Sequence, residues 1–234
     1  MESVNGGNGL GNGHARIGAP LGPSVVPLSA QSASTASGVP IGEIVDTAVA
    51  EFAAQACTLN VAPPFGGFVK VTSAERTVYG VVYAIHTGSL EPGGRPVLRG
   101  RDGMRDGAIF DQNPDLEQLL RTEFSALIVG FEEHDDPRRV IRSYLPPSPP
   151  PLHWSVVECD RDEIARLTTR LDYFRTILSA SYAPIDALLA ANVRLAGAAR
   201  PDESAFRIAA GRELATLLKH DYPRLSAILR ALAD

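Results

Sequence analysis

A run of five prolines within seven residues, Leu145–Pro151, constrains this chain more than any other feature of its sequence. Proline lacks a backbone N–H and holds φ near about −65°, so neither a helix nor a central strand can run through the segment. We therefore expect this strap, residues 145–151, to end a β-structured part and to separate it from the rest of the chain. Use of the strap as a polyproline ligand for another protein is the less favoured alternative.

The residues before the strap show strand patterns. In Thr77–Thr87 both faces are apolar, with Tyr79, Val81 and Ile85 on one and Val78 and Val82 on the other. Such a pattern is typical of a strand buried on both sides in a sandwich or barrel. Similar runs occur at residues 67–71, 124–131 and 140–145, and a last strand is expected at 153–158.

Two segments before the strap favour helix. Asn113-Pro114-Asp115 has the order of an N-cap, a first-turn proline and an acid, and predicts one short helix with Leu116, Leu119 and Leu120 facing inward. Residues 43–55 place Ile44, Ala48 and Phe52 on one helical stripe. The alanines there also favour helix by propensity, so the pattern alone predicts helix for this stretch.

After the strap the apolar spacing becomes helical. Asp160-Arg161-Asp162-Glu163 resembles a capping box, and the stripe that follows it runs from Ile164 to Leu178. Prolines 184, 201 and 223 each precede a further apolar stripe. We expect four short amphipathic helices that form a small bundle.

The composition of the chain leads to expectations for its N-terminal tail, its localisation and its cysteines. Residues 1–38 are rich in Gly, Asn, Ser and Ala with few large apolar side chains, which predicts a disordered tail. The start lacks the apolar core of a secretory signal and no run is long enough to span a membrane, so we expect a cytoplasmic protein.

Only two of the 22 basic residues are lysines, a bias typical of a GC-rich bacterial genome. Cys57 and Cys159 are expected to be reduced core residues.

The middle of the chain resembles a known family. The segments that carry the likeness are Gly42-Glu43-Ile44-Val45-Asp46-Thr47, Ala62-Pro63-Pro64-Phe65-Gly66-Gly67, Tyr79-Gly80-Val81-Val82-Tyr83, Gln118-Leu119-Leu120-Arg121-Thr122-Glu123-Phe124 and the strap. Together they look like a stand-alone HAS-barrel domain protein, as found in photosynthetic bacteria. Related barrels form the N-terminal domains of HerA-type DNA-translocating ATPases and of rotary ATP synthase subunits, where they form rings and dock partners.

The resemblance implies an α+β fold. A closed barrel of about six strands would occupy residues 39–158, including the strap 145–151, and a helical domain would occupy 159–234. It also implies that Gly42–Cys57 is a strand or a bent pair of strands, against its propensity. These motifs are structural and indicate a fold better than an activity.

No catalytic centre is expected. The chain has no Gly-x4-Gly-Lys-Ser/Thr loop to hold nucleotide phosphates, so ATP binding and hydrolysis are not predicted, nor is any cofactor. We expect a non-catalytic binding or assembly module that docks a protein through its barrel, a ring ATPase or a membrane-associated assembly being candidate partners. Homo-oligomer contacts remain open. The alternative is an accessory DNA-processing protein acting with a HerA-type ATPase.

The candidate docking residues are Arg95, Arg99, Arg101 and Arg105, on a glycine-rich excursion. Four arginines can grip phosphate or an acidic protein surface. Asp102 and Asp106 offset part of this charge, no aromatic residue is interleaved to stack on bases, and the formal net charge is −5. A solvated loop, a protein-docking loop and a nucleic-acid contact therefore all remain, with nucleic acid the least favoured.

A second charged segment lies at residues 132–142. Glu132-Glu133-His134-Asp135-Asp136 is dense in metal-ligand types, but five consecutive residues in a turn point in different directions. Arg138, Arg139 and Arg142 follow it closely. Solvated ion pairs are therefore expected rather than a metal site.

Overall fold

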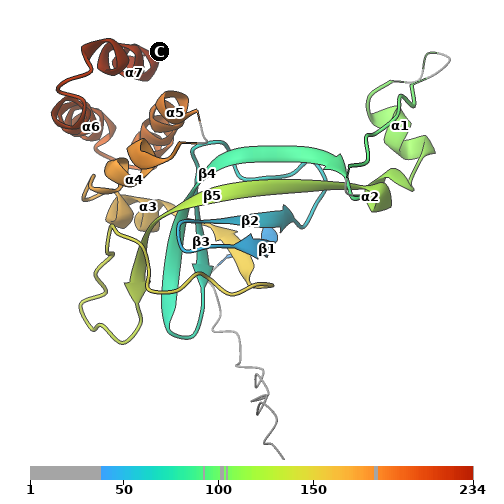
Figure 1. The fold of residues 1–234 in the computed structure, drawn as a ribbon, viewed down its shortest axis with the longest axis horizontal. Coiled ribbons are helices and arrows are strands. Elements are labelled where there is room, and N and C mark those ends of the chain that lie inside the picture. The colour runs from blue at the N-terminus through green and yellow to red at the C-terminus, as the bar shows by residue number, and fades with distance from the viewer. Residues whose placement is uncertain (1–37, 92, 101–102, 104, 182–183, 234) are drawn as a thin grey trace, which may run out of the picture. The chain divides into compact units, whose positions relative to one another are not determined.

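The computed structural model describes residues 38–91, 93–100, 103, 105–181 and 184–233. The predicted disordered tail, residues 1–38, lies outside these residues except for Gly38. Within them the chain forms a closed, six-stranded antiparallel barrel followed by helices (Figure 1). The predicted α+β class and the order of barrel and helices are thereby confirmed.

Six strands close the barrel in the order β1-β2-β5-β4-β3-β6. Their bounds are β1 Gly42–Thr47, β2 Glu51–Ala56, β3 Phe68–Thr72, β4 Arg76–Ser89, β5 Leu120–Glu133 and β6 Ser155–Glu158. The bent pair of strands expected at Gly42–Cys57 is confirmed as β1 and β2, although propensity favours helix there. The reason is space, because Ala54, Ala56 and Ala126 are buried together in the barrel interior, which accepts only small side chains at these positions.

The strap does not end the barrel. β6 comes after it in the chain and pairs with both β1 and β3, so the strand that closes the barrel lies beyond the prolines. The strap lies against the barrel, where Thr47 Oγ1 donates a hydrogen bond of 2.9 Å to the carbonyl oxygen of Pro150. The chain bends at residues 147–148 and buries Pro146 and Pro150, a geometry unlike that of a continuous, exposed polyproline helix.

The strand predicted at residues 140–145 is wrong. Only one isolated bridge forms there, between Phe131 and Arg142. The physical reason is that the chain bends at Ser143 and Tyr144 and then enters the prolines at 146 and 147, so pairing along β5 does not extend beyond this bridge. The chain after it therefore passes over the barrel as a loop that leads into the strap.

Apolar faces on both sides of the strands serve two cores. Val78, Val82 and Ile128 point into the barrel. The side chains on the other face, such as Tyr79 and Val81, point outward toward the helices. Together with Phe68, Leu127 and Val129 on the neighbouring strands, they form one continuous hydrophobic cluster with buried residues of the helices as far as Leu232. A strand pattern without polar alternation is thus explained by burial on both faces.

Among the described residues after the barrel, five helices are present rather than the four predicted. They are α3 Arg161–Leu167, α4 Tyr173–Ser179, α5 Ile185–Ala198, α6 Glu203–Leu217 and α7 Tyr222–Ala233. The predicted capping box is confirmed, since the Asp160 side chain accepts from Glu163 N at 2.8 Å and Glu163 accepts from Asp160 N at 3.0 Å. The predicted first helix breaks after Leu167, where the Thr168 and Thr169 hydroxyls donate to carbonyls one turn back.

A glycine turn joins the barrel to the helices. Gly66 has φ +83° and lies directly against α5, where an added Cβ would be 2.8 Å from Asn192 N. The fully buried Asn192 donates to the Gly66 carbonyl oxygen at 2.9 Å and accepts from the Tyr173 hydroxyl at 2.9 Å. Burial raises the pKa of Tyr173, so this hydroxyl stays protonated as a donor.

The helices and the outer face of the barrel therefore share one core. Whether residues 39–158 and 159–234 can fold separately stays a prediction. Among the described helices, none has both the length and the apolar character that a membrane crossing would need.

Gly66→Ala should destabilise the protein far more than Gly93→Ala. Both glycines have positive φ, +83° and +75°, so both substitutions incur a left-handed penalty of roughly 1–2 kcal/mol. Only at Gly66 would the new methyl group meet α5, which should add about 1–3 kcal/mol, because nothing lies within 4 Å at Gly93. Urea unfolding of both variants checks this, and equal losses would contradict the proposed joint.

Candidate partner-docking site

A two-stranded arm extends from the barrel. β4 and β5 stay paired from Arg76↔Glu133 to Ser89↔Leu120, whereas β3 pairs with β4 only as far as Val81. Past Val82 no described strand covers the free edge of β4, and the ribbon runs on to α1 and α2 (Figure 1). We define the arm as residues 84–123. Because β2 pairs with β5 as far as Glu123, the arm is a two-stranded ribbon from the pair Thr87↔Thr122 onward.

The β4 strand of the arm is exposed on both faces from Ala84 to Thr87, whereas Thr122 on β5 is buried. Ala84, Ile85, His86 and Thr87 are all exposed, and the side chain of Ile85 keeps 44% of its surface in solvent. The prediction of a strand buried on both faces therefore holds for residues 77–82 and fails beyond them. The edge residues 84–89 include no Lys, Arg, Asp, Glu or Pro, the usual protection of a strand edge against pairing with another chain.

The excursion at the end of the arm is a small structured unit. Its neck is closed by a 2.8 Å hydrogen bond from Leu90 N to the Leu119 carbonyl oxygen. Two short helices, α1 Gly107–Gln112 and α2 Leu116–Leu119, replace the single helix expected. Asn113 ends α1 instead of starting a helix, because its side chain donates to the Ile109 carbonyl oxygen at 2.8 Å.

The three leucines expected to face inward from α2 differ in burial and position. Leu116 is buried, Leu119 is 43% exposed, and Leu120 is the first residue of β5. The expected helix thus supplies one buried anchor, and the chain turns at once into the long strand.

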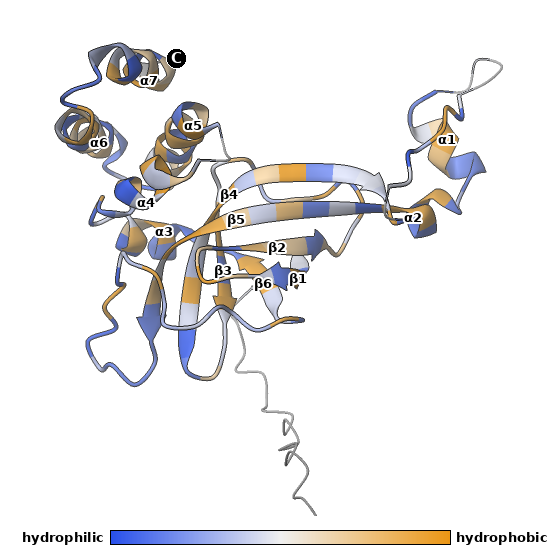
Figure 2. Ribbon diagram, in the orientation of Figure 1, coloured by the Kyte–Doolittle hydropathy of each residue, from blue (hydrophilic) through white to orange (hydrophobic). Residues whose placement is uncertain are grey.

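A groove of about 640 Å³ lies on this excursion. Its apolar lining includes Val97, Leu98, Ile109, Phe110 and Leu116. Val97 and Leu98 are strongly exposed, at 71% and 87%, whereas Leu116 is buried. Figure 2 shows hydrophobic and hydrophilic residues intermixed on α1 and α2 at this end of the arm.

The four predicted arginines have different positions. Arg99 and Arg105 line the groove, Arg95 is exposed but does not line it, and Arg101 lies outside the described residues. Arg99 donates to Asn113 Oδ1 at 3.2 Å and pairs with Asp115 at 3.5 Å, so it helps to hold the excursion together. Among the described residues no ion pair is found for Arg95 or Arg105.

Sequence reasoning missed the apolar part of this site. The run Pro96-Val97-Leu98 between glycine-rich stretches was the available signal, because exposed aliphatic side chains in a polar loop often mark a contact surface. The arginines had indicated the same segment by their charge alone.

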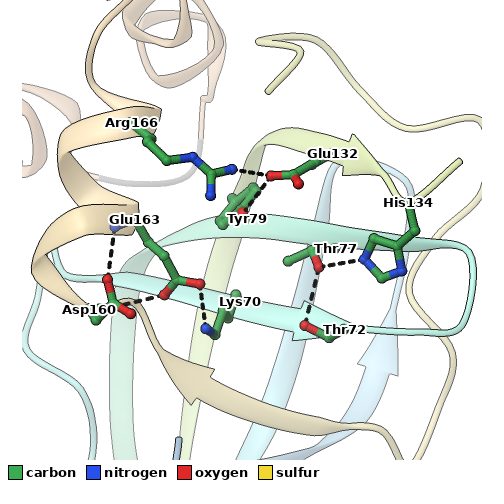
Figure 3. Close-up of polar contacts among 9 residues, drawn as sticks. All are labelled: Lys70, Thr72, Thr77, Tyr79, Glu132, His134, Asp160, Glu163 and Arg166. Carbon is green, nitrogen blue, oxygen red and sulfur yellow. Dashed lines mark hydrogen bonds and ion pairs between the residues drawn. The ribbon is translucent and has the colours of Figure 1, made fainter. Parts of the chain in front are cut away.

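A second cluster of polar groups lies between the barrel and α3 (Figure 3). Lys70 on β3 is 4% exposed and forms an ion pair with Glu163, which also closes the capping box with Asp160. The lysine thus points at the first turn of α3. This contact fastens the helix to the barrel wall.

Glu132 forms the other half of this cluster. Its buried carboxylate pairs with Arg166 on α3 and with Arg139 Nε at 2.7 Å, and accepts from the Tyr79 hydroxyl at 3.3 Å. Burial raises the pKa of Tyr79 and the neighbouring Glu132 raises it further, so the phenol remains a donor. All three contacts satisfy a buried charge, which indicates a structural role for the cluster.

Three acids of the segment 132–136, namely Glu132, Glu133 and Asp136, form ion pairs with arginines. Asp136 pairs with Arg138 and Arg142 at 3.1 Å each. The hydrogen bonds from Arg138 lower the pKa of Asp136, which keeps its carboxylate ionised. Within the described part of the chain, no three His, Cys, Asp or Glu side chains gather closely enough to hold a metal ion.

The ion pairs of this hairpin are not simply solvated, as was expected. The side chains of Glu132 and Asp136 are only 3% and 8% exposed, whereas those of Arg138 and Arg139 are 77% and 61% exposed. The pairs of Arg138 and Arg139 thus join a buried acid to an exposed base, whereas Arg142 is only 21% exposed.

The two cysteines differ. Cys57 is exposed, so its assignment to the core is wrong, whereas Cys159 packs against the shared core. Cys57 directly follows β2, where the chain leaves the barrel wall. Burial raises the pKa of Cys159, which keeps its side chain a thiol.

Comparison with known proteins finds no family model and no curated protein that matches this chain. The HAS-barrel identity therefore rests on the resemblance described above and stays a prediction. What the structure shows is a closed six-stranded antiparallel barrel followed by helices.

Glu132→Gln should lower the free energy of unfolding by about 2 kcal/mol, because it weakens charge-assisted hydrogen bonds at a buried acceptor. The matched control is Glu75→Gln, since Glu75 pairs with Arg76 but its side chain is 81% exposed. An exposed pair contributes roughly 0–1 kcal/mol. Denaturant unfolding measures both, and a loss at Glu132 no larger than at Glu75 would contradict a structural role for the cluster.

Proposed function

We propose that this chain is a non-catalytic adaptor, related to HAS-barrel domains, that docks a protein partner through the arm of its barrel. The observation that carries the proposal is the arm, where no described strand pairs with the β4 edge and where residues 84–87 of β4 are exposed on both faces. An isolated two-stranded ribbon is marginally stable in water, so a partner that covers it would stabilise both.

The barrel and helices supply the rigid base in this proposal. The long strands β4 and β5 are buried on both faces within the barrel and continue directly into the arm. A partner bound to the arm is thereby held at a fixed place relative to the helices. A bacterial, cytoplasmic setting, with a ring ATPase or a membrane-associated assembly as the partner, belongs to the same proposal.

An accessory role in DNA processing is the second candidate. The exposed Arg95 and Arg105 favour it, whereas Asp106, Asp111 and Glu117 on the same excursion disfavour it. Binding to duplex DNA that weakens steeply between about 50 and 200 mM salt would support this candidate. Absence of binding at the lower salt would leave the protein-docking proposal.

Catalysis is tested separately. The proposal expects no magnesium-dependent ATP turnover by the purified chain above a no-protein control. Turnover that persists through successive purification steps and tracks with the protein would overturn the adaptor proposal.

Leu98→Asp should remove the partner without unfolding the protein. Leu98 is 87% exposed, so its replacement should change stability by less than about 0.5 kcal/mol. Because Leu98 is proposed to anchor the interface, its replacement by Asp should weaken the complex about tenfold or more. The wild-type and variant chains are used as baits for affinity purification from the source organism. A protein that the wild type retains and Leu98→Asp loses is then purified, and its affinity for each chain is measured by titration.

Ile208→Asp is the matched control, because Ile208 is 56% exposed on α6, outside the arm. This variant should retain the partner with unchanged affinity. A partner that both variants bind equally, or that only Ile208→Asp loses, would refute docking through the arm.

A further inference from the structure

The β4 edge of the arm is open over residues 84–89. The barrel is closed, so each of its strands has a neighbour on both sides within it. On β4 the second neighbour ends at Val82, whose N–H donates to the Gly67 carbonyl oxygen at 2.9 Å. Residues 84–89 stay in unbroken register with β5 on the other side, and no described strand pairs with their free edge (Figure 1).

The backbone groups on this edge belong to alternate residues. Leu90 N donates to the Leu119 carbonyl oxygen, so the N–H of Leu90 points to the β5 side. Alternate residues of an antiparallel strand bond the same neighbour, so the odd-numbered residues turn their N–H and C=O groups to the free edge. These residues are Ile85, Thr87 and Ser89.

The side chain of Thr87 agrees with this assignment. Its hydroxyl lies 2.8 Å from the hydroxyl of Thr122, the residue opposite it on β5. Side chains approach closely in this way where the two residues exchange no backbone hydrogen bonds with each other. The backbone of Thr87 is therefore available on the free edge.

The free edge lacks protection against pairing with an identical edge. Natural proteins block such edges with charged residues or proline, because every chain meets other copies of itself. Residues 84–89 include no Lys, Arg, Asp, Glu or Pro. Ile85 and Thr87 are β-branched and exposed, which favours strand pairing. Two copies of this edge can therefore meet without opposing like charges.

We infer that the β4 edge pairs antiparallel with the β4 edge of a second copy of this chain, about a two-fold axis at Thr87. This register uses all three outward-facing residues, because Ile85 then bonds Ser89 of the other copy and the two Thr87 residues face each other. Parallel pairing is disfavoured, since it would bring the Gly66–Gly67 segments of both barrels to the same place. Antiparallel pairing separates the two barrels.

The inference goes beyond the proposed adaptor function. The natural partner is assigned to the apolar excursion around Leu98, whereas the second copy occupies residues 84–89. Pairing joins two marginal ribbons into one four-stranded sheet, and sheets of three or more strands are more stable. Because the paired edge is short, we expect a dissociation constant of roughly 10–100 μM.

Sedimentation equilibrium of the full chain from about 1 to about 500 μM tests the inference. The wild type should change from monomer to dimer over this range. Thr87→Lys and Thr87→Glu should each weaken the dimer about tenfold or more, because each sets like charges opposite each other at the axis. An equimolar mixture of the two variants should restore a dimer within about threefold of the wild-type affinity, since opposite charges then meet.

Two further measurements make the test independent of any loss of folding. Thr216→Lys and Thr216→Glu are matched controls, because Thr216 is exposed on α6, outside the arm, and both should dimerise like the wild type. In the wild type, amide hydrogen exchange followed by NMR should show protection that rises with protein concentration at the outward-facing residues. These residues are Ile85, Thr87 and Ser89.

The contrary outcomes are equally specific. A chain that stays monomeric at about 500 μM overturns the inference, as does a dimer that both Thr87 variants retain. A mixture that restores no dimer, with no concentration-dependent protection at residues 85, 87 and 89, overturns it too. If the chain is monomeric while Leu98→Asp still loses a natural partner, the docking function stands and only the dimer is wrong. If the dimer forms as expected while Leu98→Asp loses no protein, the dimer stands and the docking proposal fails.

Discussion

The contact on which the rest of the structure depends is the meeting of Gly66 with Asn192 and Tyr173. A residue with a side chain at position 66 would collide with α5, and without the Asn192 amide the buried Gly66 carbonyl and Tyr173 hydroxyl would lose their partners. The same turn holds β4, because Gly66 N donates to the Val82 carbonyl oxygen at 2.7 Å. One glycine turn therefore connects the barrel wall, the helices and the base of the arm.

This connection gives the long strands two different halves. As far as Val82, β4 is buried by the barrel interior on one face and by the helices on the other; beyond it, the strand is exposed. The ion pairs Lys70–Glu163 and Glu132–Arg166 add a second attachment, between α3 and the wall. The arm thus continues the two strands whose other halves are buried on both faces. Because those buried halves are fixed in the barrel wall, the groove at the end of the arm is held at a defined place.

Much of the fold could be predicted from the sequence, and the exceptions have local causes. The apolar run at Thr77–Val82 and the capping box at Asp160 were sufficient because each depends on neighbouring residues, whereas the same pattern misled beyond Val82. The last strand expected at 153–158 is present as β6, but the strap before it was wrongly treated as an end, because the pairing of β6 with β1 is a long-range contact. The groove was missed for the same reason, since it forms where Val97 and Leu98 lie near α1.

Hydrogen exchange followed by mass spectrometry tests the central claim that barrel and helices form one cooperative unit from which the arm extends. The account predicts that amides of β3, of residues 77–82 and of residues 188–193 exchange together in the slowest class, set by global unfolding. Amides of residues 84–99 should exchange faster in the free protein. A helical segment 188–193 that exchanges well before the barrel strands would contradict the shared core, and an arm as protected as β3 would contradict its exposure.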